Sequence, residues 1–235
     1  MKKDTSSCNF DLVAIDLDGT LVDSVGDLHA AVVDMLVAID RPPVEEEDVR
    51  SWVGNGVERL VHRALTRHMD RDADEVEFKT GLACFQQAYE RVNGRQSRLY
   101  PGVAEGLEWL ATLGIPLVMI TNKASQFAYP LLASMNIAEF FQHGIAGDEV
   151  AAKKPDPAAL LLAAERFEAN PERCLLIGDS VSDIKAARAA RFTSICVSYG
   201  YNHGQSVRAL QGQLKPDAII DSFTELPTAF TQLSM

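Results

Sequence analysis

Four aspartates are the side chains of this 235-residue chain with the clearest capacity for chemistry. Asp16 and Asp18 stand at the end of one short apolar run, Asp179 follows another, and Asp183 comes four residues after Asp179. Residues two apart on a strand point to the same side, so Asp16 and Asp18 are expected to share one edge of a sheet. If the two runs are neighbouring parallel strands, all four carboxylates converge on one crevice.

Such a cluster of carboxylates requires a cation. Two like charges about 4 Å apart repel by roughly 4 kcal/mol at an effective dielectric near 20. Oxygen ligands without nearby His or Cys favour a hard divalent ion, and Mg²⁺ is the usual one where a phosphate completes the coordination. Each fragment alone also has a structural interpretation, because Asp-Gly is a common turn and Gly-Asp-Ser a common helix start.

Groups that could bind an anion follow at the same predicted edge. Thr121 and Asn122 end a further apolar run and offer a hydroxyl and an amide. Lys153 and Lys154 precede Pro155, just before a predicted helix. We expect Lys153 to be a solvated surface residue and Lys154 to reach the edge as a phosphate clamp.

Alternating strands and helices must position these residues. Short aliphatic runs bounded by turn residues predict strands at Phe10–Leu17, Pro116–Thr121, Cys174–Gly178, Thr193–Ser198 and Asp217–Asp221. Helical patterns between them cover Val103–Leu113, Ser125–Met135, Pro157–Phe167 and Ser182–Ala190. This alternation predicts an α/β protein with a doubly wound parallel sheet and a ligand crevice at the carboxyl ends of the strands.

Residues 23–96 interrupt this alternation, because their apolar residues recur only at helical spacing. We interpret them as a helical cap over the crevice, inserted into a core made of residues 1–22 and 97–235. The alternative is an extra helical layer without a gating role. Within the segment, Gly54-Asn55-Gly56 is either a loop that faces the pocket, where Asn55 or Arg59 meets the substrate, or an ordinary turn between helices.

Composition excludes several classes of partner. Asp and Glu number 33 against 22 Lys and Arg, so the net charge is −11 and the chain lacks the basic surface that nucleic acids require. The longest purely apolar run, Ala158–Ala164, is far too short to cross a bilayer, and no signal peptide is evident. The four scattered cysteines fit buried free thiols in a reducing cytoplasm, which is the expected location. We expect a monomer or a homodimer.

In chain order, the motifs D-x-D-G-T-L, T-N, K-P and G-D-S-x-x-D resemble the four signature motifs of the haloacid dehalogenase-like phosphohydrolase superfamily. They are Asp16–Leu21, Thr121-Asn122, Lys154-Pro155 and Gly178–Asp183, and they span the predicted core. The resemblance implies a Rossmann-like core with an inserted all-helical cap of the C1 type.

The same resemblance implies a role for each motif residue. Asp16 is the nucleophile and Asp18 the acid/base. The phosphate is bound by Thr121, Asn122 and Lys154. Mg²⁺ is held by the Asp16 carboxylate, the Asp18 backbone carbonyl and Asp179, with Asp183 in support.

Within the superfamily, Asp18 argues against a dehalogenase, which lacks a carboxylate at that position. Several stretches are similar to the bacterial phosphoglycolate phosphatases: Asp16–Ser24, Trp52–Leu65, Thr121-Asn122-Lys123, Pro155–Glu165 and Tyr199–Gly204. This similarity implies a small phosphate monoester as the partner, 2-phosphoglycolate first. A phosphatase or phosphomutase of sugar phosphates and a non-catalytic phosphate-binding protein are the alternatives. We expect Tyr199–Gly204 to be a loop beside the site, with His203 on the surface.

Overall fold

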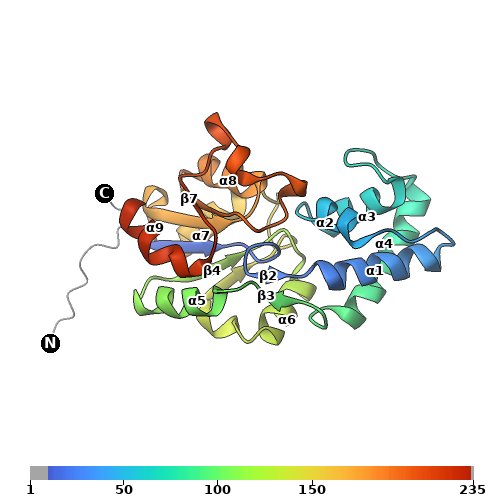
Figure 1. The fold of residues 1–235 in the computed structure, drawn as a ribbon, viewed down its shortest axis with the longest axis horizontal. Coiled ribbons are helices and arrows are strands. Elements are labelled where there is room, and N and C mark those ends of the chain that lie inside the picture. Colours follow the sequence, from blue (N-terminus) through green and yellow to red (C-terminus); the bar gives the residue numbers. More distant parts are fainter. Residues whose placement is uncertain (1–9, 234–235) are drawn as a thin grey trace.

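The computed structural model describes residues 10–233, so the start of the predicted core segment 1–22 and Cys8 lie outside the described residues. Within them, a six-stranded parallel sheet has the order β5-β4-β1-β6-β7-β8 (Figure 1). The strands are β1 (Leu12–Ile15), β4 (Leu117–Ile120), β5 (His143–Ile145), β6 (Cys174–Gly178), β7 (Thr193–Val197) and β8 (Ala218–Ile220). The predicted α/β fold with a parallel sheet is confirmed.

Helices cover both faces of this sheet because its strands carry apolar side chains on both sides. Along β1 and the two residues that follow it, side chains alternate between the two faces of the sheet. One face carries Val13, Ile15 and Leu17, and the other carries Leu12 and Ala14. The first face is covered by α5 (Val103–Thr112), α6 (Ser125–Ser134) and α9 (Leu226–Leu233), and the second by α7 (Ala158–Arg166) and α8 (Val181–Ala190). The result is the three-layer arrangement of a doubly wound domain.

Two features of the β structure, an edge strand of the main sheet and a separate two-stranded sheet, were not predicted. β5 is a three-residue edge strand that contains a glycine and is only partly buried, so it lacks the aliphatic run that marks its neighbours. A small antiparallel pair joins β2 (Val22–Asp23) to β3 (Arg98–Leu99), where the chain leaves the core and returns to it. Strands of two residues are too short to show periodicity in a sequence.

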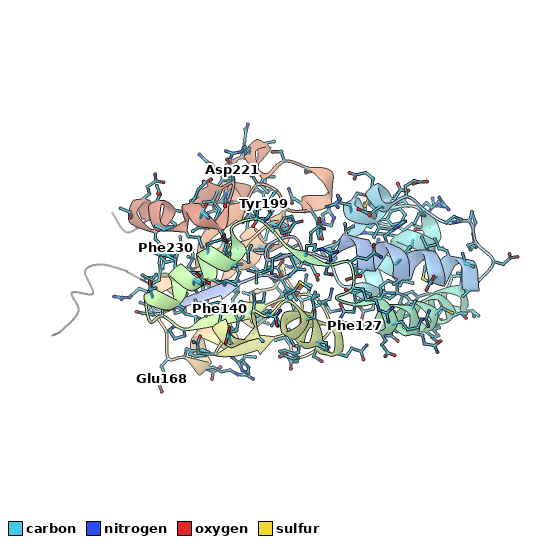
Figure 2. All side chains as sticks on the ribbon, turned by 60° about the horizontal axis from the view of Figure 1, so that its bottom comes forward. Phe127, Phe140, Glu168, Tyr199, Asp221 and Phe230 are labelled. Carbon is cyan, nitrogen blue, oxygen red and sulfur yellow. The ribbon has the colours of Figure 1, made fainter. Side chains whose placement is uncertain are left out.

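The segment between β2 and β3 forms a separate group of helices beside the core (Figure 1). They are α1 (Val25–Ala38), α2 (Glu46–Trp52), α3 (Val57–Thr66) and α4 (Glu75–Val92). α1 packs against α4, and the group has its own apolar core, which Phe127 of α6 joins from the main domain. Figure 2 shows Phe127 near the junction of the two groups and Phe230 toward the opposite end of the core.

A buried carboxylate ties the start of this helical group to its end. Asp27, in the first turn of α1, is fully buried. It accepts hydrogen bonds from the backbone N–H groups of Gly94, Gln96 and Ser97 at 2.9, 2.8 and 3.1 Å, and from the Ser97 hydroxyl at 2.5 Å. These bonds give acceptors to the backbone N–H groups of Gly94, Gln96 and Ser97, which lie outside helices and strands and have no partners there.

Within residues 10–233, Cys174 and Cys196 are buried free thiols, whereas Cys84 is a partly exposed free thiol, so the prediction of burial is wrong for Cys84. None of the helices in this part of the chain combines the length and the apolar character that a membrane span requires.

Candidate active site

Sheet topology brings three of the four motifs to adjacent strand ends. β1 lies between β4 and β6 and pairs in parallel with both. Asp16, Thr121 and Asp179 each follow one of these strands directly and are all buried. The convergence that the sequence predicted at the carboxyl edge of the sheet is therefore present.

Three of the four aspartates form one cluster. Ligand oxygens of Asp16, Asp179 and Asp183 lie within 4.8 Å of one another, and the three residues are 6%, 4% and 3% exposed. Asp183 is fixed at the start of α8 by a capping box, in which its carboxylate accepts from the Ser180 backbone N–H at 3.1 Å, and it also accepts from the Ser180 hydroxyl at 2.6 Å. A Cβ at Gly200 would overlap Asp179, so glycine is required for that loop to pack on this side chain.

Lys154 supplies the counter-charge to this cluster. Its ammonium donates to Asp16 Oδ1 at 2.6 Å, to Asp183 Oδ1 at 2.7 Å and to the Ile120 carbonyl at 3.0 Å. Burial alone would lower the pKa of Lys154, but the two carboxylates raise it above its ordinary value. The lysine is therefore a fixed cation on the floor of the pocket.

One lysine does not neutralise three buried carboxylates. Burial and the nearby Asp183 raise the pKa of Asp16 to about 7, against the opposing attraction of Lys154. Burial, Asp183 and Asp16 likewise raise the pKa of Asp179 well above its ordinary value. Burial and the neighbouring carboxylates therefore both oppose the ionised form of the cluster, and a set of carboxylate oxygens without His or Cys fits a hard divalent cation.

Asp18 stands apart from the cluster. Its carboxylate accepts from the Lys123 ammonium at 2.9 Å (Oδ1) and 3.0 Å (Oδ2), and Oδ1 also accepts from the Ser24 hydroxyl at 2.5 Å. Sequence reasoning gave no role to Lys123 or Ser24. The signal for Lys123 was its place directly after Thr121-Asn122, whereas Ser24 lies beyond the end of its motif and had none.

The predicted phosphate binders lie at the pocket in different settings. Thr121 lines it, and its hydroxyl accepts from the Lys123 backbone N–H at 3.2 Å. The Asn122 amide donates to the carbonyls of Gly54, at 3.0 Å, and of Lys154, at 2.9 Å. In this structure Asn122 thus links the helical group to the core, and its role toward phosphate stays a prediction.

The helical group supplies an apolar wall opposite the carboxylates. The residues that line the pocket from its side are Leu28, Val53, Gly54, Gly56, Val57 and Leu60. The loop of Gly54-Asn55-Gly56 therefore faces the pocket, which decides between the two interpretations of this loop. Asn55 instead accepts from Arg63 at 2.9 Å, and Arg59 binds the Met69 carbonyl and Asp72, so neither lines the pocket.

The loop after β7 lies beside the site, as predicted. The Tyr201 backbone N–H donates to Asp179 Oδ2 at 2.7 Å, and its hydroxyl donates to Asp23 at 2.8 Å. Tyr199, visible in Figure 2, donates to the carbonyl of Thr20 at 2.8 Å. His203, which was expected on the surface, is only partly exposed. Its ring contacts the helical group, with Nδ1 3.0 Å from the Ser51 carbonyl of α2.

Comparison with known proteins agrees with this geometry. The sequence matches the haloacid dehalogenase-like hydrolase family over residues 10–191. It is 46% identical over 222 residues to a phosphoglycolate phosphatase of Nitrosococcus oceani, covering 94% of this chain and 97% of the relative. A phosphoglycolate phosphatase of Pseudomonas putida is 44% identical over 216 residues, with 92% and 78% coverage.

A solved structure shares the whole architecture. The crystal structure of a predicted phosphoglycolate phosphatase from Haemophilus somnus superposes with a TM-score of 0.86 at 33% identity, covering 94% of this chain and 98% of that one. The chain belongs to the haloacid dehalogenase-like hydrolases. Its sequence predicts a phosphoric monoester hydrolase, and the comparisons support this enzyme class.

Proposed function

We propose that the protein is a Mg²⁺-dependent phosphatase that converts 2-phosphoglycolate to glycolate and phosphate through an aspartyl-phosphate intermediate. The observation that carries this proposal is the separation of two aspartates within one pocket. Asp16 lies beside a fixed cation, Lys154, 2.6 Å away, whereas Asp18 lies outside the acidic cluster and is paired with Lys123. Two carboxylates in one pocket can take different roles when their surroundings differ.

The two aspartates divide the reaction into two displacements. In the first, a carboxylate oxygen of Asp16 bonds to phosphorus as the ester P–O bond breaks, and Asp18 gives its proton to the leaving alkoxide. In the second, Asp18 takes a proton from water, whose oxygen attacks phosphorus and releases phosphate and the Asp16 carboxylate. Splitting the hydrolysis in this way lowers each barrier.

The cation has a defined place in this scheme. Asp16 and Asp179 would hold it directly, with the Asp18 backbone carbonyl, and Asp183 would support it. When bound, Mg²⁺ supplies positive charge to the phosphoryl oxygens. Lys154, which already contacts Asp16, contributes charge from the protein side, and Thr121 and Asn122 would donate to the phosphate.

We further propose that residues 23–96 act as the cap that encloses the leaving group. The Asn122 contact to Gly54, and the ion pair of Lys153 with Glu58 at 2.8 Å, join this segment to the core across the pocket. Enclosure excludes water and strengthens the electrostatic interactions inside.

Phosphate release from 2-phosphoglycolate, glucose 6-phosphate and pyrophosphate, measured with and without Mg²⁺, tests this function. We expect 2-phosphoglycolate to be preferred, Mg²⁺ to be required, and Asp16→Asn to lower kcat by at least about a thousandfold, because the nucleophile is lost. Asp34→Asn is the matched control, since Asp34 is exposed on α1. A preference for glucose 6-phosphate would refute the substrate, and full activity of Asp16→Asn would refute the mechanism.

A further inference from the structure

The pocket is lined by two cations that contact different aspartates. Among residues 10–233, Lys123 and Lys154 are the positively charged side chains that line it. Lys154 contacts Asp16 and Asp183, on the side where the phosphoryl group is proposed to react. Lys123 contacts Asp18, on the side of the leaving group. The phosphoryl chemistry proposed above uses Lys154 and leaves Lys123 without a role toward the substrate.

Resting on the proposed function, we propose that Lys123 binds the carboxylate of the substrate and so selects esters whose leaving group carries a carboxylate one carbon from the ester oxygen. A general acid lies about 3 Å from the oxygen that it protonates. Lys123 Nζ lies 2.9 and 3.0 Å from the two Asp18 oxygens. The ammonium is therefore within about 6 Å of the ester oxygen.

The spacing within the substrate matches this distance. In 2-phosphoglycolate, a carboxylate oxygen lies about 3 Å from the ester oxygen, across one carbon. Because the ammonium is at most about 6 Å from the ester oxygen, it can lie about 3 Å from that carboxylate oxygen, which is hydrogen-bonding distance. An ammonium has three N–H donors, and the Asp18 carboxylate accepts two of them, so one is left for an oxygen of the ligand.

The position of Lys123 is fixed from both sides. Its side chain is 3% exposed, and its ammonium lies 4.9 Å from the ring centroid of Tyr89, which belongs to α4 and is fully buried. Burial between the core and the helical group keeps solvent from screening the charge. A hydrogen bond between an ammonium and a carboxylate is stronger in such a setting than one between neutral groups.

The remaining wall favours a small acid over a sugar. The side chains of Leu28, Val53, Val57 and Leu60 line the pocket from the helical group and offer no hydrogen-bonding groups, whereas Ser180 and Ser182 line it from the core. A leaving group with several hydroxyls would lose its hydrogen bonds to water against this surface, which opposes binding. A single carboxylate also loses its hydration, but the ion pair with Lys123 would offset that loss.

The test compares 2-phosphoglycolate with its carboxamide analogue, which has the same shape without the charge. The readout is kcat/KM for 2-phosphoglycolate divided by kcat/KM for the carboxamide. This ratio is measured in wild type and in Lys123→Gln. The amide of Gln can still donate to Asp18, so any effect on the acid/base acts on both esters and cancels in the ratio. We expect the ratio to fall by roughly 10- to 100-fold, as for the loss of a charged hydrogen-bond partner.

Two further variants complete the design. Lys153→Gln is the matched control, because Lys153 is the neighbouring lysine, pairs with Glu58 at 2.8 Å and does not line the pocket. It should leave the ratio unchanged. Lys123→Met serves as the second variant if circular dichroism shows that the glutamine variant is not folded, and the same fall in the ratio is expected.

The outcomes separate this inference from the proposed function. If wild type prefers 2-phosphoglycolate and the Lys123 variants retain that preference within about twofold, only this inference is overturned. If wild type hydrolyses both esters equally, or prefers a different phosphate ester, the substrate assignment and this inference both fall.

Discussion

At the residue scale, four aspartates and two lysines divide into two groups with different duties. Asp16, Asp179 and Asp183 share one lysine and have too little positive charge. Asp18 has a lysine to itself and a serine hydroxyl as well. The shortage of positive charge in the first group favours a divalent cation. In the metal-free protein, the same shortage makes the free energy of unfolding depend on pH.

We expect the metal-free protein to lose stability as pH rises. The Asp16 pKa is about 7 when folded against an ordinary value of 3.8, so between these values the folded state keeps a proton that the unfolded state has released. The free energy of unfolding therefore falls as pH increases from about 4 to about 7, by an amount of order a few kcal/mol. Asp179 acts in the same direction.

Urea denaturation in EDTA at several pH values between about 4 and about 8 measures this effect. Asp16→Asn removes one of the two groups, so its slope of stability against pH should be shallower than that of wild type. Equal slopes for the two proteins would contradict the assignment of the raised pKa to Asp16.

At the scale of elements, the helical group is attached to the core through short segments that carry few backbone hydrogen bonds of their own. The β2–β3 pair and the bonds to Asp27 hold the exit and the return of the chain together. Such a junction depends on a few side chains, and the buried carboxylate of Asp27 is the one with the most partners there.

Asp27→Ala should lower the free energy of unfolding by about 3 kcal/mol, because it leaves three backbone N–H groups and a hydroxyl without their acceptor. Asp34→Ala on the same helix is the control. Asp34 pairs with Arg91 at 3.2 Å on an exposed face, so its loss should change stability by less than about 0.5 kcal/mol. Equal losses in the two variants, measured by urea denaturation, would rule out the junction role of Asp27.

At the scale of the whole molecule, a net charge of −11 coexists with a site for a small anion. The acidic surface disfavours the binding of extended polyanions. The electrostatic potential inside the pocket, however, depends on the charges that line it. Two buried lysines and a divalent cation bound by the acidic cluster would balance the charge of the four aspartates that line the pocket. Binding of that cation should therefore stabilise the entire fold.

We expect Mg²⁺ to raise the melting temperature in proportion to the logarithm of its concentration, because it binds the folded state only. At a concentration of 100 times Kd the gain is about 2.7 kcal/mol. Asp179→Asn should abolish the shift, since it removes a ligand from the cluster. NaCl at matched ionic strength is the control, and an equal shift with NaCl would show that general screening, not binding, is responsible.

The sequence by itself determined the alternation of strands and helices, the helical insertion and the motif residues, because these depend on periodicity and spacing along a short stretch of chain. Only the tertiary structure decided which lysine pairs with which aspartate. Lys123 reaches Asp18 across 105 residues and Lys154 reaches Asp16 across 138, and such pairings are set by the order of the strands in the sheet. The apolar wall opposite them was also decided at this level, because local sequence does not specify which face of a helix packs over a distant strand end.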